Sequence, residues 1–260
     1  MDVKSTTLDV AGAPIEVRSV EGQAPGLFWL GGYRSDMAGT KALALEALAA
    51  AHGLQSTRFD YSGHGQSGGD FLDGSISRWL GEAMAVFSAA SQNGLQILVG
   101  SSMGAWVALR MVQELNTAEC APIAGLVLLA PAPDFTVELM EPELTDAQKA
   151  EMEAKGYFEE PTPYGPEPNR FTKLLFDDGR ENNRVMTGPI DTFCPVHIIQ
   201  GKQDPDVPWQ HAQRLYELLS KDDATLTYVA DGDHRLSRDE DIAVIERSVL
   251  TMAEQVKNVA

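Results

Sequence analysis

A pentapeptide at residues 100–104, Gly-Ser-Ser-Met-Gly, constrains the fold of this 260-residue chain more than any other feature. It places Ser102 between two glycines. Residues 95–99 before it form a short apolar run typical of a buried strand, and residues 105–111 after it continue as a helix. Side chains two positions either side of the serine would collide with that strand and helix. The pattern therefore predicts a tight strand-to-helix turn with Ser102 at its tip.

Such a turn lifts the serine hydroxyl clear of the sheet and brings the next backbone N–H close to it. This is the arrangement expected of a nucleophilic serine, with the amide of Met103 as one of the donors that stabilise an oxyanion. The alternative is a glycine-rich β-to-α turn with a buried serine that has no chemical role. Residues elsewhere in the chain must show whether Ser102 is a nucleophile or only part of a structural turn.

The order of the remaining elements predicts an α/β fold. An alternating β-hairpin at 6–10 and 15–18 is followed by strands and helices that take turns along the chain. The expected strands are 26–30, 54–59, 95–99, 123–130, 196–199 and 225–229, and the expected helices include 37–51, 75–91, 209–220 and 239–256. This order predicts an eight-stranded, mostly parallel sheet with an antiparallel N-terminal hairpin and helices on both faces. We expect residues 1–260 to form a single domain.

One long segment interrupts the alternation. Between 131 and 189 we expect no strand, only helix-prone stretches such as 145–155 and a proline-rich run at 161–166. A plain connection of this length is unusual in a compact domain. We therefore predict a helical cap insertion at about 134–189 that covers the ends of the strands, with an insertion on a sheet edge as the alternative.

Two roles are open for the side chains of this cap. Its apolar residues either line a site for an acyl chain or pack the cap onto the body. Arg170 and Lys173 either pair with an anionic leaving group or are ordinary surface charges. The apolar residues are Met140, Met152, Tyr157, Phe158, Tyr164, Phe171, Leu174, Leu175 and Phe176.

Charge and composition argue against several function classes. The net charge of −18 repels phosphate backbones, so nucleic acid is not an expected partner, and anionic membranes repel such a surface too. No apolar run approaches the roughly 18 residues of a membrane span, and the first residues lack a signal-peptide pattern. We expect a cytoplasmic protein. The cysteines, Cys120 and Cys194, are too few for a disulfide framework, and no Cys/His cluster has metal-ligand spacing.

A nucleophilic serine needs a histidine base, and that histidine needs a carboxylate to orient it. In a fold with this elbow, the chain order is serine, acid, histidine. His52 and His64 precede the serine, His197 lies in an apolar strand as a core residue would, and His211 lies on a helix face expected to be solvated. His234 follows the last strand, at the sheet edge where ligands bind. The sequence therefore predicts His234 as the base.

The acid is expected at the end of a strand between the serine and the base. Asp204 follows the strand at 196–199 and precedes His234 by 30 positions, so it is the predicted acid. Asp206 is its rival, although a charge at a helix N-terminus explains Asp206 as well. Asp134 is a more distant alternative.

A tetrahedral oxyanion needs two N–H donors held in place before the reaction. One is predicted at Met103, and the other in the Gly31-Gly32-Tyr33 loop after the third strand. Its glycines allow close backbone approach, and the Tyr33 amide is the expected donor. The alternative is that the two glycines only form a tight turn.

These stretches resemble the alpha/beta-hydrolase superfamily along the whole chain. More narrowly, they are similar to the subfamily of alpha/beta hydrolase domain-containing protein 10 and its bacterial relatives. The matching stretches are 30–33 with Met37 and Gly39, 58–63, 97–104, 207–209 after Asp204, and 233–235.

The resemblance implies a Ser102–Asp204–His234 triad and activity on carboxylic esters, acyl thioesters such as S-palmitoyl cysteine, and acyl glucuronides. We expect a serine hydrolase that forms a covalent acyl-enzyme on Ser102 and needs neither metal nor cofactor. Its expected partner is a small acyl ester or thioester, or an acylated protein. The alternatives are a peptidase or C–C bond hydrolase of the same fold, and a non-catalytic binding protein. The animal relatives are mitochondrial, whereas this N-terminus carries no evident targeting sequence.

Overall fold

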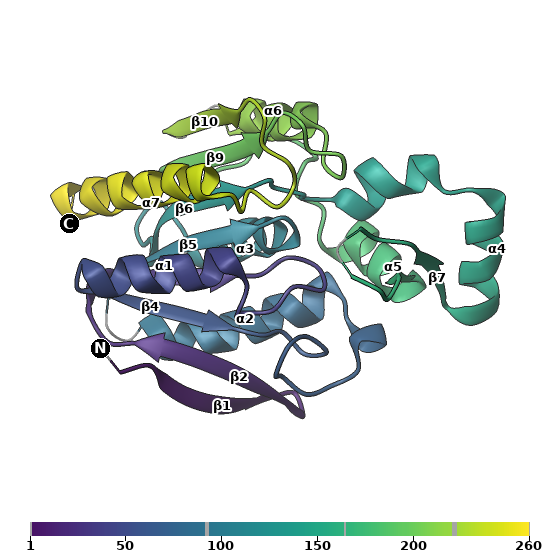
Figure 1. The fold of residues 1–260 in the computed structure, drawn as a ribbon, viewed down its shortest axis with the longest axis horizontal. Coiled ribbons are helices and arrows are strands. Elements are labelled where there is room, and N and C mark those ends of the chain that lie inside the picture. The colour runs from purple at the N-terminus through teal and green to yellow at the C-terminus, as the bar shows by residue number, and fades with distance from the viewer. Residues whose placement is uncertain (1, 92–93, 164, 220–222, 260) are drawn as a thin grey trace.

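The computed structural model describes residues 2–91, 94–163, 165–219 and 223–259. Eight strands form one sheet in the order β1-β2-β4-β3-β5-β6-β9-β10 (Figure 1). Their bounds are β1 Lys4–Val10, β2 Ala13–Val20, β3 Gln23–Leu30, β4 Leu54–Phe59, β5 Gln96–Ser101, β6 Ile123–Leu129, β9 Val196–Gly201 and β10 Ala224–Val229. The predicted eight-stranded sheet is confirmed.

The antiparallel part of the sheet lies at its N-terminal edge. β1 pairs with β2 and β2 with β4 in antiparallel fashion, and the other neighbours are parallel. The β1–β2 turn has φ of 52° at Ala11 and 83° at Gly12. Two positive φ angles match the twist of a two-residue hairpin, which explains why the chain reverses here.

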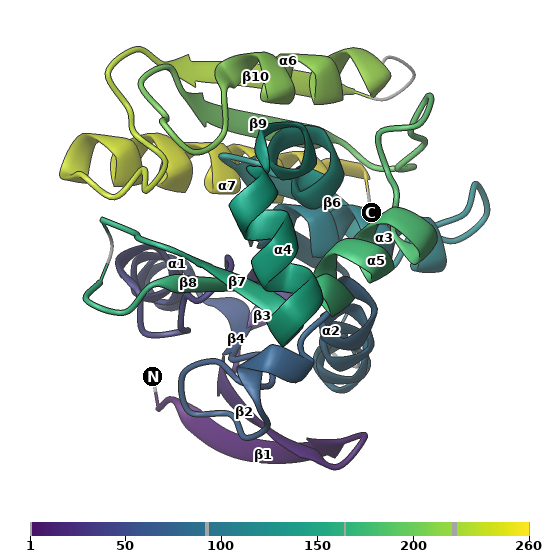
Figure 2. The same cartoon turned by 90° about the vertical axis from the view of Figure 1, so that its right-hand side faces the viewer.

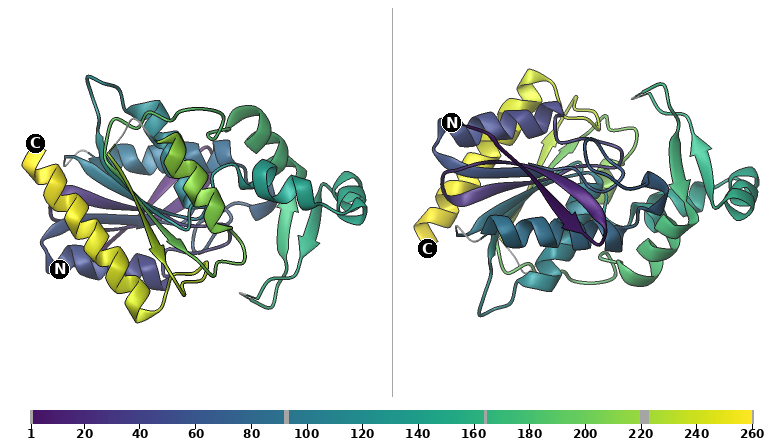
Figure 3. Two further views of the ribbon diagram at one scale, coloured as in Figure 1. Left: turned by 90° about the horizontal axis from the view of Figure 1, so that it is seen from above. Right: turned by 90° about the horizontal axis from the view of Figure 1, so that it is seen from below.

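Helices cover both faces of the sheet, as predicted. α1 and α7 pack against one face, and α2, α3 and α6 against the other (Figures 1 and 3). Their bounds are α1 Thr40–Ala51, α2 Ile76–Ala90, α3 Met103–Leu115, α6 Trp209–Leu218 and α7 Asp239–Val259. α1 begins three residues later than predicted, because its N-cap Gly39 still has an extended backbone with ψ of 157°. The Met37 N–H, ahead of the helix, donates to the buried Asp60 carboxylate. In the described part of the chain, no helix is both long and apolar enough to cross a bilayer.

The insertion between β6 and β9 contains α4 (Asp146–Lys155) and α5 (Lys173–Asn182), and it lies beyond one end of the sheet (Figures 1 and 2). α4 confirms the helix predicted at 145–155. Thr145 and Gln148 form a capping box at its start, and Gly156 closes it with φ of 82°.

The prediction that this insertion holds no strand is wrong. β7 (Tyr157–Glu160) and β8 (Asn169–Thr172) form an antiparallel pair in which Phe158 faces Phe171 and Glu159 faces Arg170. The two phenylalanines are buried, whereas Glu159 and Arg170 form an exposed ion pair. Each strand is only four residues long, so alternation on one strand is too brief to recognise without its partner.

The glycines around Ser102 allow α3 to sit close to the end of β3. A Cβ on Gly104 would lie 2.1 Å from the carbonyl oxygen of Leu30 and 2.6 Å from that of Gly31. A Cβ on Gly100 would lie 2.6 Å from the carbonyl oxygen of Gly104. Such distances leave no room for a side chain, so both positions require glycine for the elbow to form.

Gly104→Ala is therefore expected to lower the free energy of unfolding by about 3 kcal/mol, because backbone carbonyls cannot move away as side chains can. Gly81→Ala is the matched control. Gly81 lies on the exposed side of α2, and an added Cβ there would meet no atom within 4 Å. The free energy of unfolding of this control is expected to rise by about 0.5–1 kcal/mol, because alanine has a higher helix propensity than glycine. Denaturant unfolding measures both, and equal stability of the two variants would contradict the close-packed elbow.

Candidate active site

Ser102 lies at the tip of the predicted strand-to-helix turn. Its φ of 54° and ψ of −115° are a strained combination for a residue with a side chain. Its N–H donates to the Leu129 carbonyl at 2.9 Å, and its carbonyl accepts from the amides of Ala105 and Ala132. The surrounding backbone thus holds the strained conformation from both sides.

Ser102, His234 and Asp204 form one hydrogen-bonded chain. His234 Nε2 lies 3.1 Å from Ser102 Oγ, and His234 Nδ1 lies 2.8 Å from Asp204 Oδ2. The three residues come from the β5–α3 turn, the loop after β10 and the loop after β9. The structure therefore brings together the three side chains that the sequence order singled out.

The Asp204 carboxylate is fully enclosed and held by four donors. Besides His234, the amides of Asp206 and Val207 donate to Oδ1, and Gln200 Nε2 donates to Oδ2 at 3.1 Å. Burial alone would raise the pKa of Asp204, but the hydrogen bonds to His234 and to the two backbone amides outweigh it and lower the pKa. The carboxylate is thus ionised at neutral pH and favours a proton on His234 Nδ1.

The two alternative acids, Asp206 and Asp134, lie in other surroundings than Asp204. Asp206 is an exposed residue on the same loop as Asp204. The Asp134 side chain is fully buried, and its carboxylate accepts the amides of Val185 and Met186 and the Nε–H of Arg184, each at 2.9 Å. These contacts give Asp134 a structural role at the ends of the insertion.

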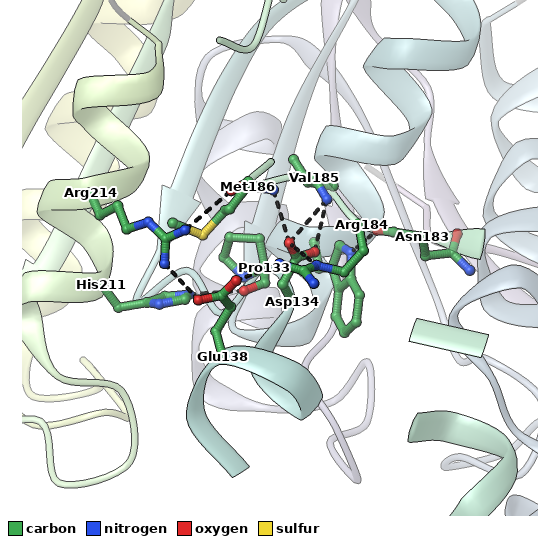
Figure 4. Close-up of polar contacts among 10 residues, drawn as sticks. Pro133, Asp134, Glu138, Asn183, Arg184, Val185, Met186, His211 and Arg214 are labelled. Atoms are coloured by element: carbon green, nitrogen blue, oxygen red, sulfur yellow. Dashed lines mark hydrogen bonds and ion pairs between the residues drawn. The ribbon is translucent and has the colours of Figure 1, made fainter. Parts of the chain in front are cut away.

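Figure 4 shows how this carboxylate joins the start of the insertion to its end. Asp134 follows β6, whereas Arg184 lies just after α5. Glu138 in the first turn of the insertion pairs with Arg184 and with Arg214 of α6, the latter at 2.6 Å. The two ends of the insertion are thereby fastened to each other and to the body.

The loop predicted to supply an oxyanion donor lies against the serine. A Cβ on Gly32 would be 3.4 Å from the Ser102 Cβ, and Tyr33 lines the same cleft as Ser102 and His234. Met103 is the first residue of α3, where backbone N–H groups have no partner within the helix. The loop that carries Tyr33 and the start of α3 that carries Met103 are therefore both next to the serine.

Ser102 and His234 open into a cleft of about 630 Å³ between the body and the insertion. Its lining is mixed, with only slightly more apolar than polar surface, and its charges come from Arg34, Glu160, Glu167 and Asp206. Arg34 and Glu167 also border a second cavity of about 330 Å³ that His64 and Arg170 line. The apolar wall consists of Tyr33, Ala132, Phe135, Leu139, Met140, Phe171, Val207 and four prolines at 161, 163, 166 and 205.

The apolar residues of the insertion divide between the two roles left open by the sequence. Met140 and Phe171 line the cleft. Met152, Phe158, Leu175 and Phe176 are buried in the core and pack the insertion onto the body, whereas Leu174 is 49% exposed. Tyr157 is half-buried, and Tyr164 lies outside the described residues.

The two basic residues singled out in the insertion are engaged with neighbouring acids. Arg170 pairs with Glu159 at 2.9 Å, and Lys173 pairs with Asp177 at 2.7 Å. Arg170 also lines the second cavity. Both behave as the surface charges that the sequence allowed.

Three of the other histidines lie outside the Asp204–His234–Ser102 chain. His52 is exposed after α1, and His197 is half-buried and 2.8 Å from Thr227 Oγ1. The prediction that His211 is solvated is wrong: it is buried and hydrogen-bonded to the Pro133 carbonyl at 2.9 Å. α6 turns His211 inward because the start of the insertion covers it.

Three residues of the site could also be considered as metal ligands. Asp204, Asp206 and His234 each offer one ligand atom, and these atoms lie within 4.8 Å of one another. Asp204 Oδ2 and His234 Nδ1 are already hydrogen-bonded to each other, so a metal ion would have to replace that bond. The arrangement is better suited to orienting an imidazole.

Sequence reasoning missed two residues of this region. Gln200 is a fully buried amide in β9 that contacts Asp204, and a polar residue inside an apolar strand just before the predicted acid was the available signal. Arg34 reaches across to the insertion, where its Nη1 donates to the carbonyls of Glu167 and Pro168. No local pattern predicts that contact, because its partners are 133 and 134 residues away.

The sequence profile described as the alpha/beta hydrolase family matches residues 24–247. The chain belongs to this family. A crystal structure of an Agrobacterium vitis S4 protein is 52% identical, with a TM-score of 0.91 over 97% of this hydrolase and 98% of that chain. The structure of mouse alpha/beta hydrolase domain-containing protein 10 is 27% identical, with a TM-score of 0.85 over 97% and 99% of the two chains.

Mammalian relatives of this hydrolase are named palmitoyl-protein thioesterases. The mouse mitochondrial palmitoyl-protein thioesterase ABHD10 is 30% identical over 228 residues, which are 88% of this chain and 75% of the mouse protein. Its human counterpart is 28% identical over 242 residues, or 93% and 77% of the two chains. The fold, the family and a hydrolase activity rest on these similarities.

The buried histidines make the stability of this hydrolase sensitive to acid. Burial lowers the pKa of His64 from 6.5 to about 4, and burial also lowers the pKa of His197 and of His211. Below about pH 6.5 the unfolded chain binds protons that the folded protein does not, so stability falls as the pH falls. For His64 this loss continues until the pH reaches about 4.

His64→Gln removes one of these groups. Between about pH 7 and pH 5, wild type is expected to lose about 2 kcal/mol more unfolding free energy than this variant, as one histidine with these pKa values requires. Denaturant titrations at the two pH values measure the difference. Equal losses in both proteins would mean that His64 titrates normally in the folded state.

Proposed function

We propose that this protein is a serine hydrolase that cleaves carboxylic esters or acyl thioesters through a covalent acyl-enzyme on Ser102. The observation that supports this proposal is the hydrogen-bonded chain from Asp204 through His234 to the Ser102 hydroxyl, at the wall of a cleft lined in part by apolar side chains. A serine is activated when a base lies within hydrogen-bond distance of its hydroxyl and an acid that orients the base lies within hydrogen-bond distance of it in turn.

In the first step, Ser102 Oγ attacks the acyl carbonyl while His234 Nε2 takes the hydroxyl proton. Asp204 holds the imidazole with its other proton on Nδ1 and stabilises the positive charge that develops on the ring. The proton then passes from His234 to the departing alcohol or thiol, and the acyl group stays on Ser102 as an ester.

The amides of Tyr33 and Met103 are the proposed donors to the oxyanion. The loop and the helix start that carry them lie beside the serine before substrate arrives, so the reaction would need little reorganisation. In the second step a water molecule gives a proton to His234 and attacks the acyl-enzyme, which releases the acid and regenerates Ser102. These steps use only groups of this chain and water.

The cleft and the relatives together favour an acyl chain as the substrate. Part of its lining is apolar and includes the flexible side chains of Leu139 and Met140 and the rings of Phe135 and Phe171. The mouse and human ABHD10 proteins are named palmitoyl-protein thioesterases. The alignment with this hydrolase spans three quarters or more of their length. We therefore place long-chain esters and thioesters first among its substrates.

Labelling with a fluorophosphonate probe tests the catalytic assignment. Wild type is expected to become labelled, whereas Ser102→Ala is not, because the probe reacts with an activated serine hydroxyl. Asp204→Asn is expected to lower kcat for a p-nitrophenyl ester by about 10⁴-fold, since the imidazole loses its orienting charge.

Asp206→Asn is the matched control for the acid. It is a neighbouring carboxylate that lines the cleft, and it donates to Asp204 through its backbone N–H, which the substitution retains. We expect its kcat to stay within about threefold of wild type. Undiminished labelling of Ser102→Ala would refute the nucleophile, and greater damage from Asp206→Asn than from Asp204→Asn would refute the acid. A wild type that resists labelling would favour a binding protein.

The acyl preference is tested with p-nitrophenyl acetate, octanoate and palmitate beside a palmitoyl thioester. We expect kcat/KM to rise with chain length by up to about fourfold per methylene, until the cleft is filled. Leu139→Ala should weaken that rise because Leu139 lines the cleft, whereas Leu174→Ala should not because Leu174 is exposed. A flat chain-length dependence in wild type would instead favour a peptidase or C–C bond hydrolase.

A further inference from the structure

The two peptide groups on either side of Tyr33 are held by different side chains. The carbonyl of Gly32 accepts the Ser35 amide at 3.2 Å and the Ser35 hydroxyl at 2.8 Å. In a trans peptide the N–H points opposite to the carbonyl, so the Tyr33 N–H points away from Ser35. Ser35 therefore holds one of the two peptide groups that flank Tyr33, and the direction of the Tyr33 N–H also depends on the other.

The following peptide group is held by His64. The Arg34 N–H donates to His64 Nε2 at 3.2 Å, and His64 Nδ1 donates to the Ser62 carbonyl at 3.1 Å. Only a neutral imidazole with its proton on Nδ1 can make both hydrogen bonds. The loop after β4 therefore offers an acceptor to the loop after β3.

His64 is well placed to act as a rigid support. Its side chain is buried, and its ring meets Tyr61, Phe71 and Trp79 with centroid distances of 5.7, 5.1 and 5.2 Å. The Tyr33 ring packs against Phe71 and Trp79 as well. His64 and Tyr33 are thus two parts of one aromatic cluster beside the serine.

Arg34 needs such a support because its φ is 56°, a conformation that is unfavourable for a residue with a side chain. Strain of this kind persists only where neighbouring contacts determine the conformation. Here the Arg34 N–H is held by His64, and its guanidinium is held by carbonyls of the insertion. Without the His64 acceptor, the Tyr33–Arg34 peptide loses the contact that fixes its plane.

We propose that His64 is a positioning residue for the oxyanion hole: its Nε2 holds the Tyr33–Arg34 peptide while Ser35 holds the Gly32–Tyr33 peptide, and the backbone of Tyr33, fixed on both sides, keeps its N–H facing the reacting carbonyl. The inference rests on the proposed function, because it concerns a donor of that reaction. His64 does not touch the substrate carbonyl, and it acts through the backbone of Arg34.

Two amide variants separate the two hydrogen bonds of the imidazole. His64→Gln carries an oxygen the same number of bonds from Cα as Nε2, so it can accept the Arg34 N–H. His64→Asn carries a nitrogen at the position of Nδ1, so it can donate to Ser62 but has no atom that reaches Arg34. His197→Asn is the control, since His197 bonds Thr227 between β9 and β10.

Steady-state kinetics on a p-nitrophenyl ester gives the test. His64→Asn is expected to lower kcat about 10- to 100-fold with KM within about threefold, because a displaced oxyanion donor affects the transition state more than the ground state. His64→Gln is expected to keep kcat within about threefold of wild type, and His197→Asn within about twofold. Equal losses in the Asn and Gln variants would reduce His64 to a packing role and overturn the proposal.

A measurement on wild type keeps the test valid if His64→Asn does not fold. Nitrogen-15 NMR of the imidazole is expected to show an unprotonated Nε2 and a protonated Nδ1 at neutral pH. The opposite tautomer would overturn the proposal, because a protonated Nε2 cannot accept the Arg34 N–H. A different result would refute the proposed function itself: the wild type would then neither hydrolyse acyl esters nor react with the fluorophosphonate.

Discussion

The approach of Gly104 to the carbonyls of Leu30 and Gly31 is the contact on which the geometry of the site depends. It lets α3 begin directly against the end of β3, so Ser102 faces the loop that follows that strand. The loop that carries Tyr33 and the first residue of α3 are thereby both held beside Ser102. A methyl group at position 104 would separate them, because it would meet backbone atoms that cannot move aside.

The insertion is part of the site rather than an appendage. Its first and last residues are fastened at Asp134, whose enclosed carboxylate binds two backbone amides and Arg184 (Figure 4). Its hairpin contacts the proposed oxyanion loop, since the Tyr33 hydroxyl donates to the Arg170 carbonyl and the Tyr33 ring stacks on Phe171 at 5.1 Å. Substrate bound under the insertion would therefore touch a segment that is connected to the reacting centre.

Sequence patterns predicted the sheet and its covering helices well, because apolar periodicity over long segments reflects burial directly. They also selected three residues that the fold brings within hydrogen-bond distance, because the elbow, the chain order and the strand ends left few choices. The same reasoning missed β7 and β8, whose alternation spans only four residues each. It also expected His211 to be solvated, because the residues that bury it come from the distant insertion.

The sequence alone determined the α/β fold class, the turn at Ser102 and the order in which the serine, acid and histidine appear. Those features are local, since glycine spacing, apolar runs and chain order are all read from neighbouring residues. Only the tertiary structure decided which apolar side chains of the insertion line the cleft, that Asp134 is a structural carboxylate, and that His64 supports Arg34. Each of these depends on contacts between segments at least 30 residues apart, which packing brings together and local pattern cannot encode.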